Sequence, residues 1–352
     1  MVDLFAHRSF DGHEQVVFVS DATSGLRGII GIHSTALGPA AGGCRMYLYQ
    51  STQDALDDVL RLSRGMTLKN AAAGLPLGGG KCVVMADPAS SNKEELLRSL
   101  ARHVQHLGGR FWTAIDVGVS AEDADIMAEE CDYIFARASE FVSDHPPSHY
   151  TALGGFQGVR AVASHLRGTD DLHGVRVAVQ GVGQTGADLI SQLMEAGAEV
   201  VAADVNEEAL AEVVGRFGIS TVTPDLIHAQ EVDIFAPCAM GGILNDRTIP
   251  ELNCGGIAGL ANNQLERPEH GYLLLERGVA YAPDFIVNAG GVMRATMTIR
   301  SRPDRDRAIR EIAGIFETVK AILRKSDEER QPTHEIAEAI AAERIGLGTR
   351  RH

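Results

Sequence analysis

The sequence has few cysteines, a deficit of positive charge and no long apolar run. Its five cysteines are widely spread and never stand as Cys-x-x-Cys, a distribution that argues against a disulfide framework or a zinc site. Met1–Asp11 contains no apolar signal core, and the chain nowhere approaches the roughly eighteen consecutive apolar residues that span a bilayer. We therefore expect a cytoplasmic protein that is neither secreted nor inserted in a membrane.

The net charge indicates which classes of molecule the protein is not expected to bind. The 32 lysines and arginines are outnumbered by 47 aspartates and glutamates, which gives a formal net charge of −15. An acidic surface repels phosphate groups, so neither nucleic acid nor an anionic membrane is an expected partner. A hydrophobic content of 45% excludes a disordered chain. At roughly 100–200 residues per domain, the 352 residues fit two domains.

The pattern of apolar residues changes along the chain. Up to about residue 137 it predicts several strands and two amphipathic helices. After the polar, proline-bearing segment Ser143–Tyr150, short apolar strands alternate with helices, which indicates a parallel, doubly wound sheet. Asp284–Asn288 is the last strand that we expect in this sheet. The final region, Pro303–Ile345, has the spacing of two helices.

A glycine-rich turn marks a dinucleotide site. Gly181–Gly186 reads GVGQTG, a G-x-G-x-x-G that follows an apolar strand and opens a helix. In that context the glycines allow a tight turn and close approach of the backbone to a pyrophosphate, and the helix N-terminus offers free N–H groups. Asp204 ends the next strand, where a carboxylate accepts hydrogen bonds from the adenosine ribose and repels a 2′-phosphate. The pattern favours NAD over NADP; alternatively, Asp204 caps the following turn with Asn206.

Asparagines follow the later strands of the same region. Asn262 and Asn263 come after one apolar strand, and Asn288 precedes Ala-Gly-Gly. Ligands of open α/β sheets lie beyond the carboxyl ends of the strands, and a neutral amide there suits the nicotinamide carboxamide or a polar part of the substrate. The alternative is turn chemistry, because asparagine and glycine also form turns.

Two lysines stand out in the first region. The segment Arg64–Met85 contains Gly-Gly-Gly-Lys but is not a phosphate-binding P-loop, because Leu75 and Cys82 occupy two of its required positions. Lys69 and Lys81 flank the glycines among small and apolar residues. A poorly solvated lysine near another cation loses its proton more easily and can act as a base, while a charged one can hold a carboxylate. The alternative is two solvated lysines at loop ends.

Asp116 ends a further apolar strand and precedes Val117 and Gly118. A carboxylate at a strand end, in a cleft with ammonium groups, can shuttle a proton. By itself Asp116 could equally cap a turn or pair with a cation.

These segments together resemble the glutamate/leucine/phenylalanine/valine dehydrogenase family, on its branched-chain and aromatic side. The similarity covers nearly the whole chain in order, and the lysine segment is highly specific to the family. The matching segments are Gly38–Met46 (GPAAGGCRM), Leu62–Lys81, Asp116–Gly118, Val177–Gly186, Asp233–Asp246, Ala258–Leu265 and Tyr281–Val292.

The resemblance implies reversible oxidative deamination of an L-amino acid to a 2-oxo acid, ammonia and NADH. Lys69 would bind the substrate α-carboxylate, Lys81 would be the general base for the water that attacks the iminium, and Asp116 would exchange protons with the substrate nitrogen. No metal is expected. The substrate-binding positions would be Lys69, Gly42, Gly43, Met66, Ala41, Val292 and Ala295. The NAD-binding positions would be Gly181, Gly183, Gln184, Thr185, Gly186, Asp204, Val205, Thr151, Ala236, Cys238, Asn262, Asn263 and Asn288.

Residues at two positions indicate which class of amino acid the protein accepts. Glutamate members carry a lysine where this chain has Ala41, so a glutamate side-chain carboxylate would be buried here without its partner. Leucine-type members usually have leucine at that position and valine at the position of Ala295. Both residues are smaller here, which favours an aromatic or bulky apolar substrate over leucine and valine. Glutamate dehydrogenase and a non-catalytic NAD-binding regulatory module are the alternatives; the latter predicts loss of Lys69, Lys81 or Asp116, and all three are present.

We expect an α/β protein of two domains that forms a homo-oligomer. An α/β substrate-binding domain at 1–136 would be completed by C-terminal helices at about 311–352, and a Rossmann-type, doubly wound NAD-binding domain would occupy 137–310. Two segments depart from the family pattern. Phe141–Tyr150 replaces a glycine-rich hinge, and Met293–Arg307 replaces an acidic helix, so the hinge and the C-terminal connection are expected to differ.

Overall fold

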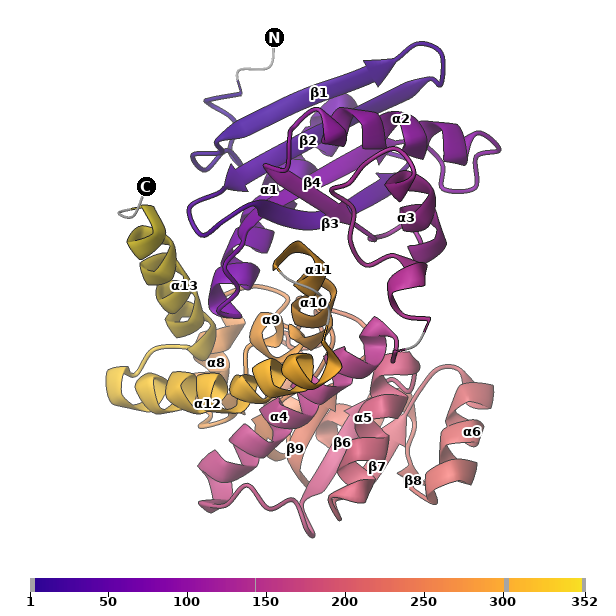
Figure 1. Cartoon of the computed structure of the whole chain (residues 1–352). Helices are drawn as coiled ribbons and strands as arrows, with labels where there is room; N and C mark the ends of the chain where they lie inside the picture. The colour runs from indigo at the N-terminus through magenta and orange to yellow at the C-terminus, as the bar shows by residue number, and fades with distance from the viewer. Residues whose placement is uncertain (1–3, 143, 301–303, 350–352) are drawn as a thin grey trace. The chain divides into compact units, whose positions relative to one another are not determined.

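The structure is a computed structural model that describes residues 4–142, 144–300 and 304–349. The chain forms two compact units (Figure 1). The first consists of the described parts of Met1–Asp144, Ala295–Pro303 and Ala341–His352, and the second of His145–Arg294 and Asp304–Ile340. The expected completion of the first unit by 311–352 is therefore wrong for most of that segment. The reason is that helix α12 (Arg305–Glu329) packs along helix α4 (Pro147–Arg167) of the second unit.

The first unit contains a mixed five-stranded sheet in the order β1-β2-β4-β3-β5. The outer strands β1 and β2 are antiparallel to their neighbours, whereas β3 runs parallel to both β4 and β5. The strands are β1 (Gln15–Asp21), β2 (Leu26–Ser34), β3 (Ala40–Tyr47), β4 (Gly78–Met85) and β5 (Phe111–Ala114). The helices are α1 (Thr52–Ala72), α2 (Lys93–Gln105), α3 (Ala121–Ala128) and the short 3₁₀ turn η1 (Ala138–Glu140).

Helices cover both faces of this sheet, because its strands are apolar on both sides. Ile29 and Val83 pack against α1, while Ile30 and Val84, one residue further on, belong to the core under α2. Lys81 shares the α1 face with Val83, since side chains alternate along a strand. The strand alternation thus directs a charged side chain toward the helix that carries Lys69.

Glycine is required where α1 and the strands approach each other. A Cβ at Gly79 would lie 2.0 Å from the backbone nitrogen of Thr67, and one at Gly42 would lie 1.9 Å from the carbonyl oxygen of Gly80. No side chain fits at either place. The first half of β3 consists of Ala and Gly, which lack the branched side chains typical of strands, so the sequence of this segment does not indicate a strand.

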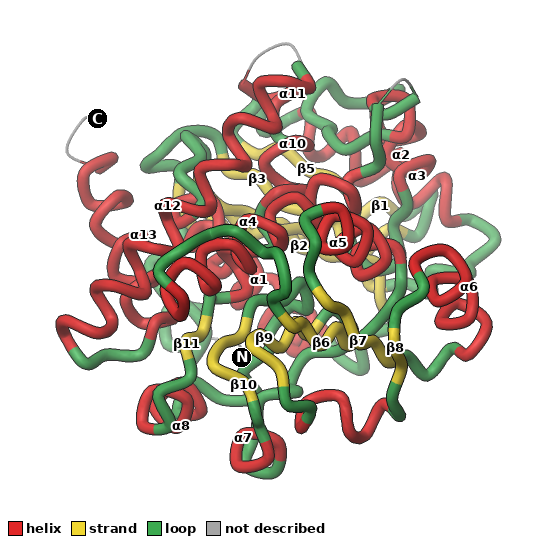
Figure 2. Tube along the Cα trace, turned by 90° about the horizontal axis from the view of Figure 1, so that it is seen from below, coloured by secondary structure: helices red, strands yellow, loops and turns green. Residues whose placement is uncertain are grey.

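The second unit is built on a six-stranded sheet in the order β11-β10-β9-β6-β7-β8, with parallel pairing throughout (Figure 2). The chain order reverses between β6 and β9. This confirms the expected α/β fold with a doubly wound domain. The strands are β6 (Arg176–Gln180), β7 (Glu199–Ala203), β8 (Ser220–Thr221), β9 (Val232–Pro237), β10 (Cys254–Ile257) and β11 (Ala280–Tyr281).

Helices α4 and α5 (Gln184–Glu195) contact one another and the strands β6, β7, β9 and β10. The remaining elements are α6 (Glu207–Phe217), η2 (Pro224–Ala229), α7 (Thr248–Glu251), α8 (His270–Glu276), α9 (Asp284–Val287), α10 (Gly290–Ala295), α11 (Met297–Arg300) and α13 (Thr333–Thr349). In the described residues, no helix combines the length and the apolar composition that crossing a membrane requires.

Three segments with a sequence-based expectation lie in or next to the second unit. The expected strand Asp284–Asn288 is wrong, because it forms helix α9, which packs so closely on α4 that a Cβ at Gly158 would lie 2.8 Å from Val287 Cγ1. The segment Phe141–Tyr150 ends in the first turn of α4, and its Ser143 lies outside the described residues. Residues 301–303 of the segment Met293–Arg307 also lie outside the described residues.

Candidate functional site

Lys81 and Asp116 form an ion pair in the first unit. Lys81 lies within β4 and Asp116 follows β5, and their side chains are 5% and 19% exposed. The Nζ of Lys81 donates a hydrogen bond to Oδ2 of Asp116. The sequence singled out both residues separately, and the fold joins them across 35 positions. An ammonium and a carboxylate in contact and largely shielded from water can exchange a proton with a bound molecule.

The second carboxylate oxygen of Asp116 is also occupied. Arg45 of β3 donates from Nε and from Nη2 to Oδ1, each at 3.3 Å. The backbone N–H of Val117 donates to the same oxygen at 2.5 Å. Burial alone would raise the pKa of the Asp116 carboxyl, but Lys81, the Val117 N–H and Arg45 together lower it below its ordinary value of 3.8. Asp116 is therefore an ionised carboxylate with both oxygens held.

Helix α1 holds Arg45 in turn. The Nη1 of Arg45 donates to Oδ2 of Asp58 at 3.0 Å, and the hydroxyl of Tyr49 donates to the same oxygen at 2.8 Å. Burial and the neighbouring Asp58 raise the pKa of Tyr49. Sequence reasoning missed Arg45, Asp58 and Tyr49. The available signal was a single charged residue near the end of a strand of small and apolar residues.

Lys69 lies in the last turn of α1, and that helix end is fixed from two sides. The side-chain amide of Asn70 donates to the carbonyl of Gly78 at 2.7 Å. Arg344, from α13, donates through Nη1 to the last two carbonyls of α1 at 2.7 and 2.8 Å. Unsatisfied carbonyls at a helix end attract cations, so the arginine acts as a cap supplied by the far end of the chain.

The glycines of β3 lie beside the other predicted substrate positions. A Cβ at Gly42 would lie 3.0 Å from Met66 Cγ, and one at Gly43 would lie 3.0 Å from Asp116 Cβ. Ala41 precedes them in the strand and is fully buried. The first unit therefore brings the small residues of β3 together with α1 and with Asp116.

The last two substrate positions lie on α10. Val292 belongs to the second unit and Ala295 to the first. Ala295 is 5% exposed. That these two residues line one pocket with Lys69 stays a prediction.

In the second unit, the glycine turn has the geometry that a dinucleotide needs. Gly181 has a φ of 95°, which favours glycine, and α5 begins directly after Gly183. A Cβ at Gly186 would lie 2.0 Å from the carbonyl oxygen of Gly181, so the helix packs onto the turn only with glycine there. Nothing lies within 4 Å of a Cβ at Gly183, which leaves that side open to a ligand. Gln184 and Thr185 form the first turn of α5, whose N–H groups have no partner within the helix.

Asp204 connects the next strand to this turn. Its Oδ2 accepts from the backbone N–H of Val182 at 2.7 Å, and its Oδ1 accepts from that of Asn206 at 2.8 Å. The carboxylate thus caps the following turn and also lies beside the glycine turn. The adjacent Val205 is 87% exposed, an apolar surface at the carboxyl end of β7.

An amide pair follows β10. Asn288 is 6% exposed and donates from Nδ2 to the Oδ1 of Asn262 at 2.9 Å. Asn263 has a φ of 53°, a left-handed backbone conformation that asparagine tolerates in turns. Because Asn288 directly follows α9, the close packing of α9 on α4 fixes its position.

The other predicted cofactor residues lie around the same strand ends. Cys238 follows β9, its N–H donates to the carbonyl of Gln180 at 2.7 Å, and burial raises the pKa of its thiol to about 12. Ala236 is buried in β9. Thr151 of α4 lies against α10, since a Cβ at Gly291 would lie 2.4 Å from its hydroxyl oxygen.

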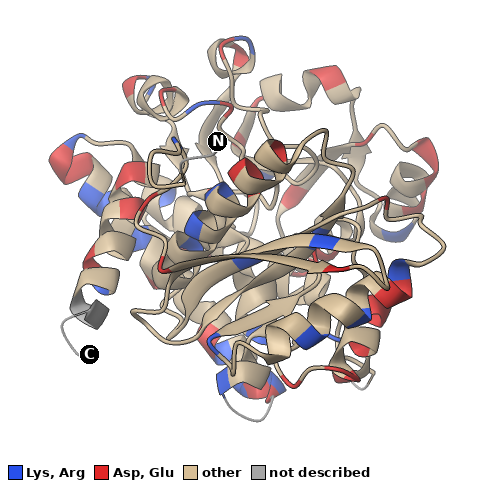
Figure 3. Cartoon of the chain, turned by 90° about the horizontal axis from the view of Figure 1, so that it is seen from above, with Lys and Arg blue, Asp and Glu red and all other residues tan. Residues whose placement is uncertain are grey.

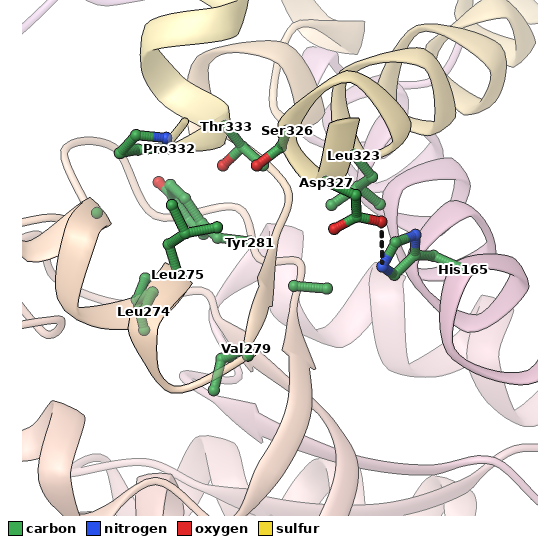
Figure 4. A pocket seen from close by; sticks show the side chains of 13 residues that line it. His165, Leu274, Leu275, Val279, Tyr281, Leu323, Ser326, Asp327, Pro332 and Thr333 are labelled. Carbon is green, nitrogen blue, oxygen red and sulfur yellow. Dashed lines mark ion pairs between the residues drawn. The ribbon is translucent and has the colours of Figure 1, made fainter. Parts of the chain in front are cut away.

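Two further features of the second unit contain none of the predicted site residues. A cavity of about 100 Å³ is lined by residues of α4, α8, β11 and α12 and by the turn before α13. At its wall, His165 of α4 and Asp327 of α12 lie 3.6 Å apart (Figure 4). Asp246, Glu266 and His270 have ligand atoms within 4.8 Å of one another. Arg267 pairs with both carboxylates, at 2.7 and 3.9 Å, and its charge opposes a cation there. Along the helices, acidic and basic positions are interspersed (Figure 3).

Comparison with known proteins identifies the family. Residues 13–139 match the family model for the Glu/Leu/Phe/Val dehydrogenase dimerisation domain, and residues 203–346 match that for Glutamate/Leucine/Phenylalanine/Valine dehydrogenase. A leucine dehydrogenase of Geobacillus stearothermophilus is 45% identical over 98% of this chain and 94% of its own. A valine dehydrogenase of Streptomyces virginiae is 44% identical over 96% and 95%. The structure of L-tryptophan dehydrogenase from Nostoc punctiforme superposes with a TM-score of 0.87 at 39% identity, covering 96% of this chain and 97% of that one.

A doubly wound parallel sheet in one unit and a buried lysine–carboxylate pair in the other are the features of an amino acid dehydrogenase. The chain belongs to the glutamate/leucine/phenylalanine/valine dehydrogenase family, which confirms the resemblance seen in the sequence. It is an oxidoreductase that acts on CH–NH₂ groups and uses a nicotinamide cofactor.

Proposed function

We propose that the protein catalyses the NAD-dependent, reversible oxidative deamination of an apolar L-amino acid to the 2-oxo acid and ammonia. The observation that carries this proposal is the Lys81–Asp116 ion pair, in which Asp116 lies beside Gly43 of strand β3. An ammonium and a carboxylate supply the proton transfers that deamination needs. The family membership supplies the reaction class.

The residues would divide the work as follows. Lys69, on its fixed helix end, holds the substrate α-carboxylate by charge-assisted hydrogen bonds. Asp116 takes and returns the protons of the substrate nitrogen. Lys81 removes a proton from the water that attacks the iminium carbon and returns it in the reverse direction. Because Lys81 and Asp116 are in contact, a proton released by one of these two side chains can be taken up by the other.

The second unit fits a dinucleotide. The open side of Gly183 and the start of α5 accommodate a pyrophosphate, and the held amides of Asn288 and Asn262 offer a donor and acceptors for a carboxamide. When bound, the nicotinamide ring accepts the hydride from the substrate Cα. Asp204 supports NAD over NADP, because a 2′-phosphate would meet a carboxylate there.

The substrate is apolar. Ala41 offers no cation to a glutamate side chain, which disfavours that alternative. The leucine and valine dehydrogenases among the relatives support a branched-chain substrate, while the tryptophan dehydrogenase and the small Ala41 and Ala295 support a larger one. We favour an aromatic or bulky apolar side chain.

The test is the formation of NADH, followed by its absorbance at alkaline pH, with L-amino acids including Phe, Trp, Leu, Val and Glu. Turnover with apolar substrates and none with glutamate supports the proposal. Silence across the panel contradicts it and leaves a non-catalytic binding module. A preference for leucine over phenylalanine and tryptophan above about tenfold in kcat/KM overturns the choice of a bulky substrate.

We further propose that the protein is a cytoplasmic homo-oligomer. The family description of residues 13–139 as a dimerisation domain supports the assembly, as does Phe18, 57% exposed on the edge strand β1. The cysteines, all with free thiols, support a reducing compartment. Light scattering after gel filtration gives the mass directly, and a monomer at micromolar concentration would contradict the assembly.

A further inference from the structure

Arg45 is the one described cation besides Lys81 that an ion pair joins to Asp116. Its guanidinium places two N–H groups on a single oxygen, Oδ1, and so leaves Oδ2 for Lys81. The planar fork of a guanidinium fixes the plane of a carboxylate in a way that a point charge cannot. The carboxylate therefore has one oxygen for anchoring and one for proton exchange.

The position of Arg45 is itself over-determined. The third nitrogen of the guanidinium donates to Asp58, and Asp58 also accepts from Tyr49 and, through its other oxygen, from Arg61 at 2.8 Å. The side chains of Arg45 and Asp58 are 23% and 15% exposed. A partly buried ion pair with ideal contacts holds its geometry better than a surface pair. The arrangement connects helix α1 to the reacting carboxylate.

We propose that Arg45 is a positioning residue for the proposed amino acid dehydrogenase reaction: it orients the Asp116 carboxylate so that Oδ2 faces Lys81 and the substrate nitrogen. This inference rests on the proposed function. Arg45 itself does not contact the α-carboxylate or the nitrogen of the substrate. It acts through Asp116, and Asp58 keeps it in place.

The charge of Arg45 has a second consequence. Charged groups that face Asp116 are Lys81 from β4 and Arg45 from β3, with Asp58 of α1 behind Arg45; the thiols of Cys44 and Cys82 are near enough to interact electrostatically. Loss of one cation from this set raises the apparent pKa of every proton-accepting group in it. The acidic limb of the kcat/KM profile then moves to higher pH.

Three variants separate geometry from charge. Arg45→Met removes both, and Arg45→Lys keeps the charge without the two-donor fork. Arg61→Met removes a cation from the same surface, where Arg61 pairs with the far oxygen of Asp58. For each we would measure kcat and KM for the best amino acid, the pH profile of kcat/KM, the dissociation constant of the reduced cofactor and the melting temperature.

Arg45→Met is expected to lower kcat about 50-fold with KM changed less than about threefold, and to move the acidic limb up by about one pH unit. Arg45→Lys should lower kcat about tenfold and leave the limb in place. Arg61→Met and all cofactor constants should match the wild type. If Arg45→Met does not fold, the Arg45→Lys variant decides by the same kcat criterion.

Wild-type kcat in both Arg45 variants, or an equal loss in Arg61→Met, would overturn the inference. So would a loss that appears only in KM, because that would place Arg45 in substrate binding. An inactive wild-type enzyme would instead contradict the proposed function, and the two failures are therefore distinguishable.

Discussion

The two units build their sites from different parts of the chain. In the first unit the site consists of charged side chains, Lys81, Asp116 and Arg45, held by one another at strand ends. The site that we propose in the second consists mainly of backbone, the turn at Gly181–Gly186, to which Asp204 adds a carboxylate. Proton transfer needs titratable groups, whereas a pyrophosphate is held well by N–H groups that never change charge. From this difference we infer that the chemistry belongs to the first unit and cofactor binding to the second.

Loss of Lys81 should have the largest effect. Lys81→Ala is expected to lower kcat/KM about 10³-fold, because general base catalysis contributes roughly 10²–10⁴. Binding of the reduced cofactor, measured by its fluorescence, should stay unchanged, since that site belongs to the second unit. Lys93→Ala, which removes a lysine paired with Asp123, is the matched control and should stay active. A Lys81→Ala variant with more than about a tenth of wild-type kcat/KM would remove the chemical role from the first unit.

Loss of Lys69 should weaken the binding of the amino acid substrate. Lys69→Ala is expected to raise the KM for the amino acid about 100-fold, because truncating one partner of a shielded charge pair costs about 2–5 kcal/mol. An amino acid amide, which lacks the carboxylate, should be turned over equally poorly by the wild type and the variant. Equal losses for the acid and the amide would show that Lys69 does not recognise the carboxylate.

In the second unit, Asp204→Asn tests the side-chain contribution to a site made of backbone. We expect the preference for NAD over NADP, measured as a ratio of kcat/KM values, to fall about tenfold, because the charge that repels a 2′-phosphate is removed. An unchanged ratio would mean that Asp204 serves only the backbone N–H groups of Val182 and Asn206.

A pair of glycine variants measures how closely α1 packs on the sheet. Gly79→Ala should lower the free energy of unfolding by about 3 kcal/mol, because the added Cβ would meet backbone at 2.0 Å. Gly65→Ala, on α1 with nothing within 4 Å, should be neutral or stabilise by about 1 kcal/mol. Urea unfolding compares the two, and a tolerated Gly79→Ala would contradict the close approach that directs Lys81 toward α1.

The smallest expected effect comes from two histidines under the N-terminal segment. The rings of His13 and His33 meet edge to face with their centroids 4.8 Å apart, and burial lowers the pKa of each below 6.5. The unfolded chain then takes up protons more readily than the folded one, so stability present above pH 6.5 declines as the pH falls toward the lowered values. Urea unfolding at pH 7.5 and pH 5.5 should show this decline, and His13→Gln/His33→Gln should reduce it. A decline of equal size in the double variant would assign the effect to other groups.

Most of the fold and half of the site follow from local sequence. The strand–turn–helix at Gly181–Gly186 is a local motif, so its place and its partner Asp204 could be predicted. The strand β3 could not, because Ala and Gly carry no strand preference and their use depends on α1 packing above them. The C-terminal helix α12 was assigned to the wrong unit, since an amphipathic pattern shows that a face is buried but not against what.

The sequence likewise predicts single residues of the site but not the contacts between them. Lys69, Lys81 and Asp116 could be singled out one by one, but the contact between Lys81 and Asp116 depends on the strand order β4-β3-β5. Arg45 was missed because its partners, Asp58 and Asp116, are 13 and 71 residues away. Networks of side chains from distant segments become visible only when the fold is known.

The most direct test of the central claim follows one atom. An apolar L-amino acid that carries deuterium at Cα is incubated with the enzyme and NAD, and the reduced cofactor is analysed by mass spectrometry and NMR. Transfer of the Cα hydride to the nicotinamide predicts one deuterium at C4 of the cofactor, together with stoichiometric ammonia and 2-oxo acid. Reduced cofactor without deuterium, or no reduction with any apolar amino acid, would contradict the account.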